Sequence, residues 1–293
     1  MKIRIGTRKS KLALIQTEMV ISELKKNFSE LEYEIVPIVT TGDKITNKNL
    51  YDIGGKALFL KELEEQLIDK QIDLALHSLK DVPGVVSDKL EIAAVLERED
   101  PRDCFVSFKY KSISELPKGG VIGSSSVRRK VLIAKQRPDL ELVQFRGNIN
   151  TRLQKLKDEE VDATILACAG LVRAGLFDSE FCYPLESEEM LPAAGQGIIA
   201  LQIRSDDKKI QEICKVINHK PTWYLSQAER SYMTYLDASC RTPMSAYAYY
   251  VGDEIKANYM LSDIDGKNIR FVSKICNIDN VNQVGIDAAK ELQ

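Results

Sequence analysis

A strand that ends in a serine-bearing turn and leads into a helix occurs twice in this chain of 293 residues. The first occurrence comprises Lys2–Ile5, Gly6–Ser10 and Leu12–Lys26, and the second comprises Val121–Gly123, Ser124–Ser126 and Val127–Gln136. Alternation of polar and apolar residues is typical of a half-buried strand, and a serine such as Ser10 is suited to cap the helix that follows it. The repetition predicts two similarly built α/β lobes that face one cleft.

Other segments of both lobes alternate between strand and helix patterns. Strands are expected at Tyr33–Val39, Ile72–His77, Leu90–Leu96, Glu141–Phe145, Ala163–Ala167 and Ile198–Ile203, helices at Ala57–Lys70 and about Asn150–Lys157, and a polar loop at Thr40–Asn49. Strands that alternate with helices indicate mostly parallel sheets covered by helices.

The last part of the chain has a different order of elements. After a Pro/Gly-rich joint at Pro192–Gly197, a helix is expected at Pro221–Asp237, strands at Ser245–Val251, Ile255–Leu261 and Ile269–Cys276, and a helix at about Val281–Leu292. Strands followed by a helix suggest a small α+β domain. We therefore expect a first lobe of residues 1–97 plus 198–217, a second lobe of residues 98–197 and a C-terminal domain of residues 218–293.

Charge and composition narrow the possible functions. The 41 basic and 43 acidic side chains give a net charge of -2, which argues against a bulk binder of nucleic acid or of a membrane surface. No apolar run reaches membrane-spanning length and the N-terminal segment lacks the apolar core of a signal peptide, so a cytoplasmic protein is expected. The six cysteines form no C-x-x-C pair and there are two histidines, so a metal site, a disulfide framework and a Ser-His-Asp triad are poorly supported.

Several arginines follow predicted strands or begin predicted helices, namely Arg8, Arg128, Arg129, Arg146, Arg152 and Arg173. The carboxyl ends of strands in an open α/β sheet form the ligand crevice, and helix N-termini add free N–H groups to an anion site. Basic residues at a helix N-terminus oppose its macrodipole, and an anionic ligand would explain them. The alternative is that these arginines are solvated or paired with Asp and Glu side chains.

Two further residues could take part in chemistry. Asp81 follows an apolar strand and precedes Pro83, where a carboxylate could stabilise a developing cation or transfer a proton; the alternative is a turn residue that pairs with Lys80. Cys240 is expected on a turn next to Arg241, whose charge would favour the thiolate, although the pattern alone favours a structural cysteine.

Two more features have structural interpretations. His77, at the end of a strand, is better explained by a structural hydrogen bond than by metal binding. Gly195-Gln196-Gly197 is too short for a phosphate loop and suits a hinge or a close approach of the backbone to a ligand.

The chain closely resembles the porphobilinogen deaminase (hydroxymethylbilane synthase) family from residue 3 to about residue 250. The resemblance consists of many motifs in the same order. They are Gly6–Leu14, Gly54–Phe59, His77–Pro83, Glu97–Asp103, Gly123–Arg129, Arg146–Asn148, Pro192–Gly197 and the segment around Cys240.

The resemblance implies a transferase with two periplasmic-binding-protein-like lobes and a small C-terminal domain. It would condense four molecules of porphobilinogen head to tail onto a covalent dipyrromethane primer, with release of ammonia, and then release the linear tetrapyrrole by hydrolysis. Cys240 matches the cysteine that holds the primer through a thioether, and Asp81 matches the catalytic carboxylate. The remaining matches are cofactor contacts at Lys80, Asp81, Ser125, Ser126, Arg128, Arg129, Arg146 and Arg152, and substrate contacts at Arg8, Ser10, Lys56, Arg173 and Gln196.

These implied roles agree with the chemistry of the residues. Each pyrrole carries two carboxylates, so a guanidinium-rich cleft would offset the charge of the growing chain without making the whole protein basic. A carboxylate at Asp81 could stabilise the electron-poor methylene-pyrrole that forms when ammonia leaves. The expected partner is the small-molecule substrate, with neither nucleic acid nor membrane, and a monomer is expected.

Two departures from the family pattern occur. Ala238-Ser239 precedes Cys240 where many family members have Gly-Gly, which could alter the turn that holds the cofactor. The chain ends at Gln293, so the last domain is expected to be slightly trimmed.

Two other classes of protein stay open. A two-lobed protein that binds a carboxylate or oxyanion would need neither Cys240 nor Asp81 chemistry. A thiol hydrolase that uses Cys240 would need a histidine partner, and none lies near it in the sequence.

Overall fold

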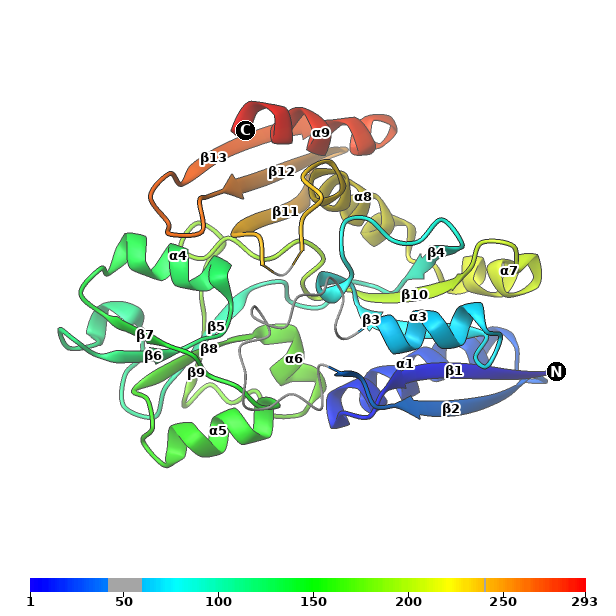
Figure 1. Cartoon of the computed structure of the whole chain (residues 1–293), viewed down its shortest axis with the longest axis horizontal. Coiled ribbons are helices and arrows are strands. Elements are labelled where there is room, and N and C mark those ends of the chain that lie inside the picture. Colours follow the sequence, from blue (N-terminus) through cyan, green and yellow to red (C-terminus); the bar gives the residue numbers. More distant parts are fainter. Residues whose placement is uncertain (42–59, 240) are drawn as a thin grey trace.

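The computed structural model of this chain describes residues 1–41, 60–239 and 241–293 (Figure 1). The first lobe is a five-stranded sheet in the order β2-β1-β3-β10-β4. Its strands are β1 (Lys2–Arg8), β2 (Glu32–Ile38), β3 (Leu74–Ser78), β4 (Leu90–Val95) and β10 (Ile199–Arg204). Four of these five strands run in the same direction, because β1 is parallel to β2 and β3 while β10 is antiparallel to both β3 and β4.

The second lobe repeats this topology with a sheet in the order β7-β6-β8-β5-β9. Its strands are β5 (Asp103–Val106), β6 (Val121–Gly123), β7 (Glu141–Val143), β8 (Ala163–Ala167) and β9 (Cys182–Pro184). Here β6 is parallel to β7 and β8, and β5 is the reversed strand between β8 and β9. The prediction of two similar lobes with mostly parallel sheets is confirmed.

Helices cover both faces of each sheet. The first lobe has α1 (Lys11–Asn27), α3 (Lys61–Ile68) and α7 (Lys208–Ile217), and the second has α4 (Val127–Gln136), α5 (Ile149–Lys157) and α6 (Cys168–Arg173). Leu24 of α1 and Ile213 of α7 share one apolar cluster with Ile5, whereas Leu63 of α3 packs on the opposite face. In the second lobe α4 packs on one face, and α5 and α6 on the other. Short 3-10 turns lie at η1 (Leu79–Asp81), η2 (Ile113–Glu115) and η3 (Ile278–Asn280).

The chain crosses between the lobes twice, between β4 and β5 and between β9 and β10. The two crossing segments lie side by side, because the Glu99 N–H donates to the Gly197 carbonyl at 3.1 Å. Gly197 has a φ of +86°, and a Cβ there would lie 2.3 Å from the Glu99 carbonyl oxygen. This contact requires glycine, and it is an approach to another backbone segment, so the predicted hinge or approach to a ligand stays a prediction.

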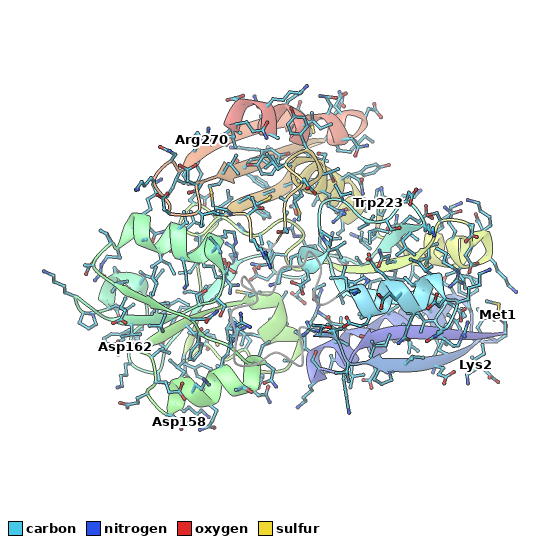
Figure 2. All side chains as sticks on the ribbon, in the orientation of Figure 1. Met1, Lys2, Asp158, Asp162, Trp223 and Arg270 are labelled. Carbon is cyan, nitrogen blue, oxygen red and sulfur yellow. The ribbon has the colours of Figure 1, made fainter. Side chains whose placement is uncertain are left out.

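A third part, at the top of Figure 1, contains an antiparallel sheet in the order β11-β12-β13 with helices α8 and α9. Its elements are α8 (Lys220–Tyr235), β11 (Met244–Val251), β12 (Glu254–Leu261), β13 (Arg270–Cys276) and α9 (Val281–Leu292). Buried Tyr232 and Tyr259 pack in its core with ring centroids 4.8 Å apart. Trp223 of α8, labelled in Figure 2, packs on a cluster of first-lobe residues that includes Leu79. The predicted α+β C-terminal domain is confirmed as a fold, and its boundaries stay a prediction.

Three differences from the sequence predictions concern local structure. The turn expected at Gly6–Ser10 begins later, because residues 6–8 continue β1 and pair with β2. The short elements β5, β9, α6 and α7 were not predicted. The expected loop and helix start that fall on residues 42–59 lie outside the described residues. Within the described ranges, no helix is both long enough and apolar enough to cross a membrane.

Candidate active site

Most of the predicted site residues lie at the carboxyl ends of the strands that run in the common direction. Arg8 ends β1, Lys80 and Asp81 follow β3, and Ser124–Ser126 follow β6. Arg173 ends α6, which begins directly after β8. Predicted site residues of both lobes therefore lie where the crevice rule for open α/β sheets would place a ligand.

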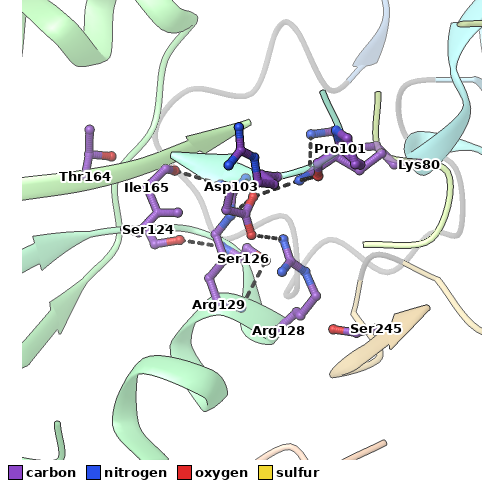
Figure 3. A network of polar contacts seen from close by, with 12 residues as sticks. Lys80, Pro101, Asp103, Ser124, Ser126, Arg128, Arg129, Thr164, Ile165 and Ser245 are labelled. Carbon is purple, nitrogen blue, oxygen red and sulfur yellow. Dashed lines mark hydrogen bonds and ion pairs between the residues drawn. The ribbon is translucent and has the colours of Figure 1, made fainter. Parts of the chain in front are cut away.

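A buried carboxylate, Asp103, lies between two adjacent guanidinium groups (Figure 3). Arg128 Nη2 lies 2.7 Å from its Oδ2, and Arg129 Nη2 lies 2.7 Å from its Oδ1. Both arginines are anchored further, since Arg128 donates to the Leu191 carbonyl and Arg129 to the Ile165 carbonyl, each at 2.7 Å. For these two arginines the alternative of pairing with an acidic side chain is therefore correct in this structure.

The charges in this cluster shift one another's ionisation. Burial favours the protonated form of Asp103, but Arg128 and Arg129 outweigh it and hold the pKa of Asp103 well below its usual range. Burial, followed by the neighbouring charge of Arg129, lowers the pKa of Lys80 to about 8. Asp103 is therefore ionised at neutral pH. Lys80 is still mostly charged there, but its pKa lies only about one pH unit higher.

Gln196 connects this cluster to the first lobe. Its Nε2 donates to Asp103 Oδ1 at 2.9 Å and to the Pro101 carbonyl at 2.7 Å, while its Oε1 accepts from Lys80 Nζ at 3.2 Å. Lys80 follows β3 of the first lobe, so one chain of hydrogen bonds links cations of both lobes (Figure 3).

Three more arginines have strong positive charge and few partners. The pKa of Arg152 is lowered to about 10, mainly by burial and then by the charges of Arg129 and Arg146. Arg146 Nε and Arg173 Nε are buried and have no hydrogen-bond partner among the described residues. Arg173 does donate through Nη2 to the Gly197 carbonyl at 2.7 Å. The orphaned guanidinium donors, and the closeness of Arg152 to the charges of Arg129 and Arg146, fit a ligand with several carboxylates.

Asp81 differs from these residues because its side chain is exposed at the end of η1. The loop that follows it is attached to the C-terminal part, since the Gly84 N–H donates to the Ala238 carbonyl at 3.2 Å and Arg230 donates to the Pro83 carbonyl at 3.1 Å. A Cβ at Gly84 would lie 2.5 Å from the Met233 carbonyl oxygen, so this approach also depends on glycine. Cys240 lies outside the described residues, and its neighbours Ala238 and Arg241 flank it on the segment that contacts this loop.

The predicted serines have local partners. Ser10 caps α1 by accepting from the Ala13 N–H at 3.3 Å, and Ser126 caps α4 by accepting from the Arg129 N–H at 3.4 Å. The Ser125 hydroxyl donates to the Phe145 carbonyl at 2.8 Å. These contacts position helix starts and the loop before Arg146, and a ligand role for the serines stays a prediction. Lys56 lies outside the described residues.

The two histidines have structural partners, as the sequence suggested for His77. The His77 Nε2 is 2.9 Å from Gln202 Oε1, and burial lowers the pKa of His77 to about 4, so the ring is neutral at pH 7. His219 lies at the N-terminus of α8 with its Nδ1 2.8 Å from the Thr222 hydroxyl.

Two buried acids were missed by the sequence reasoning. Asp103 was part of a recognised motif without an assigned role. Glu229 of α8 is fully buried and accepts from Arg98 Nη1 at 2.6 Å and from the Gly195 N–H at 2.6 Å. Sequence offers only a weak signal for such pairs, namely that adjacent arginines at a helix start need a counter-charge from elsewhere in the chain.

The fold and the site together define a class: a two-lobed α/β protein with arginine and lysine side chains gathered near its strand ends. Two family models match the chain. "Porphobilinogen deaminase, dipyromethane cofactor binding domain" matches residues 3–212, and "Porphobilinogen deaminase, C-terminal domain" matches residues 223–293. The chain therefore belongs to the porphobilinogen deaminase family.

Curated relatives agree with this assignment. The proteins named porphobilinogen deaminase from Rickettsia bellii and Rickettsia akari are each 56% identical over 289 residues, which covers 98% of this chain and 96% of each relative. Among solved structures, a periplasmic VFT2 domain of Bordetella pertussis BvgS is 14% identical with a TM-score of 0.45, covering 81% of this chain and 93% of that one. That likeness is distant and adds nothing to the family assignment.

Proposed function

We propose that this chain carries out the porphobilinogen deaminase reaction of its family. It condenses four molecules of porphobilinogen head to tail onto a dipyrromethane primer attached to Cys240, with loss of one ammonia per addition, and then hydrolyses the linear tetrapyrrole from the primer. The observation that carries the proposal is the excess of positive charge at the strand ends, within the segment that matches the cofactor-binding family model.

The residues at these strand ends fit a dipyrromethane with its acetate and propionate groups. Arg128, Arg129, Arg146 and Arg152 would bind carboxylates of the primer in the second lobe, with Ser125 and Ser126 at the same edge. Lys80 would add a charge from the first lobe. Guanidinium groups suit this role because each can donate two parallel hydrogen bonds to a carboxylate.

When bound, the primer supplies a pyrrole α-carbon as the nucleophile. The protein's own contribution to the chemistry is the Asp81 carboxylate, which would stabilise the positive charge that develops on the incoming pyrrole as ammonia leaves, and then accept a proton. The attachment of the loop after Asp81 to the C-terminal part supports this role, because Gly84, three residues after Asp81, contacts Ala238, two residues before Cys240 in the sequence. Arg8, Ser10, Lys56, Arg173 and Gln196 would bind the incoming substrate.

Intact mass and turnover test the proposal. The wild-type protein supplied with porphobilinogen should exceed its sequence mass by two linked pyrrole units, give a positive colour test for pyrroles and release ammonia. Cys240→Ala should have the bare sequence mass and no turnover. A carboxylate-binding protein would lack the adduct in both forms, and a thiol hydrolase would be inactivated by alkylation without ever carrying pyrrole. Either pattern would overturn the proposal.

The proposal includes a monomer that acts in the cytoplasm. The cytoplasm is supported by free thiols at Cys104, Cys168, Cys182, Cys214 and Cys276, because such thiols are stable in a reducing compartment. Sedimentation analysis at micromolar concentration should give the mass of one chain, and a stable dimer would contradict this part of the proposal.

A further inference from the structure

The buried carboxylate of Asp103 has a counterpart in the first lobe. The reversed strand β5 begins at Asp103, which pairs with Ala167, the last residue of β8. The reversed strand β10 begins at Ile199, which pairs with Ser78, the last residue of β3. Since β3 and β8 hold the same place in the two sheets, Ile199 and Asp103 occupy equivalent positions.

The fold itself does not need a charge at this position. Ile199 and Asp103 are both completely buried, and Ile199 belongs to the apolar core of the first lobe. Burial of an ionised side chain is costly, and apolar replacement of a buried ion pair is often neutral or stabilising. The aspartate therefore has to be explained by what it contacts.

Its contacts leave some N–H donors of the two arginines unused. The hydrogen bonds and the ion pair of Arg129 use three of its five N–H donors, and those of Arg128 use two. The remaining donors have no partner among the described residues. Asp103 thus fixes both side chains without occupying them fully.

The same carboxylate also acts on the first lobe. Gln196 connects Asp103 to Lys80 by hydrogen bonds. Burial, Arg129 and Arg128 lower the pKa of Lys80, whereas the negative charges of Asp81 and Asp103 raise it. Removal of the Asp103 charge would therefore leave Lys80 among two arginines with Asp81 as its acidic neighbour.

We infer that Asp103 is a positioning residue: it orients Arg128 and Arg129, and through Gln196 also Lys80, so that their free donors bind the carboxylates of the dipyrromethane primer and of the pyrrole units that are added to it. This role rests on the proposed function, which supplies the carboxylate ligand. Asp103 does not itself touch the reacting atoms.

The test compares Asp103→Asn with wild type and with Asp100→Asn, a matched control on the same crossing segment whose carboxylate pairs with Arg102. We expect Asp103→Asn to raise the KM for porphobilinogen at least tenfold, with kcat within about threefold of wild type per adduct-bearing molecule. The alkaline limb of its kcat/KM profile should move to lower pH, because Lys80 loses an acidic neighbour. Asp100→Asn should match wild type in all three measurements.

Thermal melting shows whether each variant is folded, and Asp103→Glu supplies a second variant that keeps the charge. We expect Asp103→Glu to fold, to raise KM through its longer side chain and to leave the alkaline limb in place. A folded Asp103→Asn or Asp103→Glu with wild-type KM would overturn the inference, and so would failure of both variants to fold, which would make the residue a folding requirement. Wild-type protein that has neither adduct nor turnover would refute the proposed function instead.

Discussion

The two lobes share one sheet topology but place different chemistry at their strand ends. The first lobe contributes an exposed carboxylate, Asp81, with Lys80 beside it, whereas the second contributes buried arginines held around Asp103. The fold thus supplies equivalent positions, and the side chains at those positions decide what each lobe does. We expect loss of Asp81 in the first lobe to affect mainly kcat, and loss of the arginines of the second lobe to affect mainly KM.

The largest expected effect is that of Asp81→Asn. Loss of the carboxylate should lower kcat by about 10²- to 10⁴-fold, because a positioned acid or base contributes about that much. The adduct on Cys240 should persist, as intact mass would show. Asp88→Asn, an exposed acid on the following loop, is the control and should be fully active. Full activity of Asp81→Asn would show that Asp81 does not take part in catalysis, and the proposed difference between the two lobes would then be wrong.

Arg146→Gln should have the next largest effect. Charged hydrogen bonds are worth about 1.5–3 kcal/mol, so loss of the guanidinium should raise KM about 10- to 100-fold with little change in kcat. Thermal stability should stay the same or rise, because Arg146 has an orphaned Nε and repels Arg152. Lys155→Gln on α5, at a half-buried residue that pairs with Glu160, should leave KM unchanged. A fall in kcat without a change in KM would contradict this role, because it would show that Arg146 acts in the chemical step and not in binding.

The charge of Lys80 should make kcat/KM depend on pH. With a pKa of about 8 in the folded protein, Lys80 is charged below pH 8 and neutral above it, so kcat/KM should fall about threefold to tenfold between pH 7 and pH 9. Lys80→Arg keeps its charge and should flatten this fall. The free energy of unfolding should rise with pH between pH 8 and pH 10.5, because the unfolded chain there retains a proton that the folded chain has lost. A profile unchanged by Lys80→Arg would show that another group titrates.

The smallest effect on activity is expected for His77→Gln. His77 is the fourth residue of β3, where the matching position of β8 is Leu166. Because the folded pKa of about 4 lies below the ordinary value of 6.5, wild type should lose up to about 1.4 kcal/mol of stability per pH unit between pH 6.5 and pH 4. Denaturant unfolding should show a smaller loss in His77→Gln, with normal activity at pH 7. If both proteins lose the same stability between pH 6.5 and pH 4, His77 is not the group that causes the loss.

The sequence predicted those parts of the fold that depend on local pattern. The helix at Val127–Gln136, the strand at Ala163–Ala167 and the helix at Val281–Leu292 have the predicted bounds, because capping and hydrophobic periodicity are local properties. The strands β5 and β9 have four and three residues, too few to show a period. The extension of β1 through Gly6 depends on partners in β2 and β3, which a local pattern does not reveal.

The site was predictable only where strand ends and motif resemblance pointed to it. The positions of Lys80 and Asp81 after β3 agree with the prediction, whereas Arg173 lies at the end of α6 and not at a turn or a helix start. The pairing of Arg129 with Asp103 joins residues 26 apart, and Gln196 lies 93 residues from the same carboxylate. Such contacts are created by the return of β5 beside β8 and by the second crossing segment, so spacing alone could not identify Asp103.

The most direct test of the central claim is the intact mass of three proteins after incubation with porphobilinogen. The account predicts that wild type carries two linked pyrrole units and transiently longer adducts, that Asp81→Asn keeps two units without further extension, and that Cys240→Ala carries none. A wild-type chain that stays at its sequence mass, or a Cys240→Ala chain that still acquires pyrrole, would contradict it.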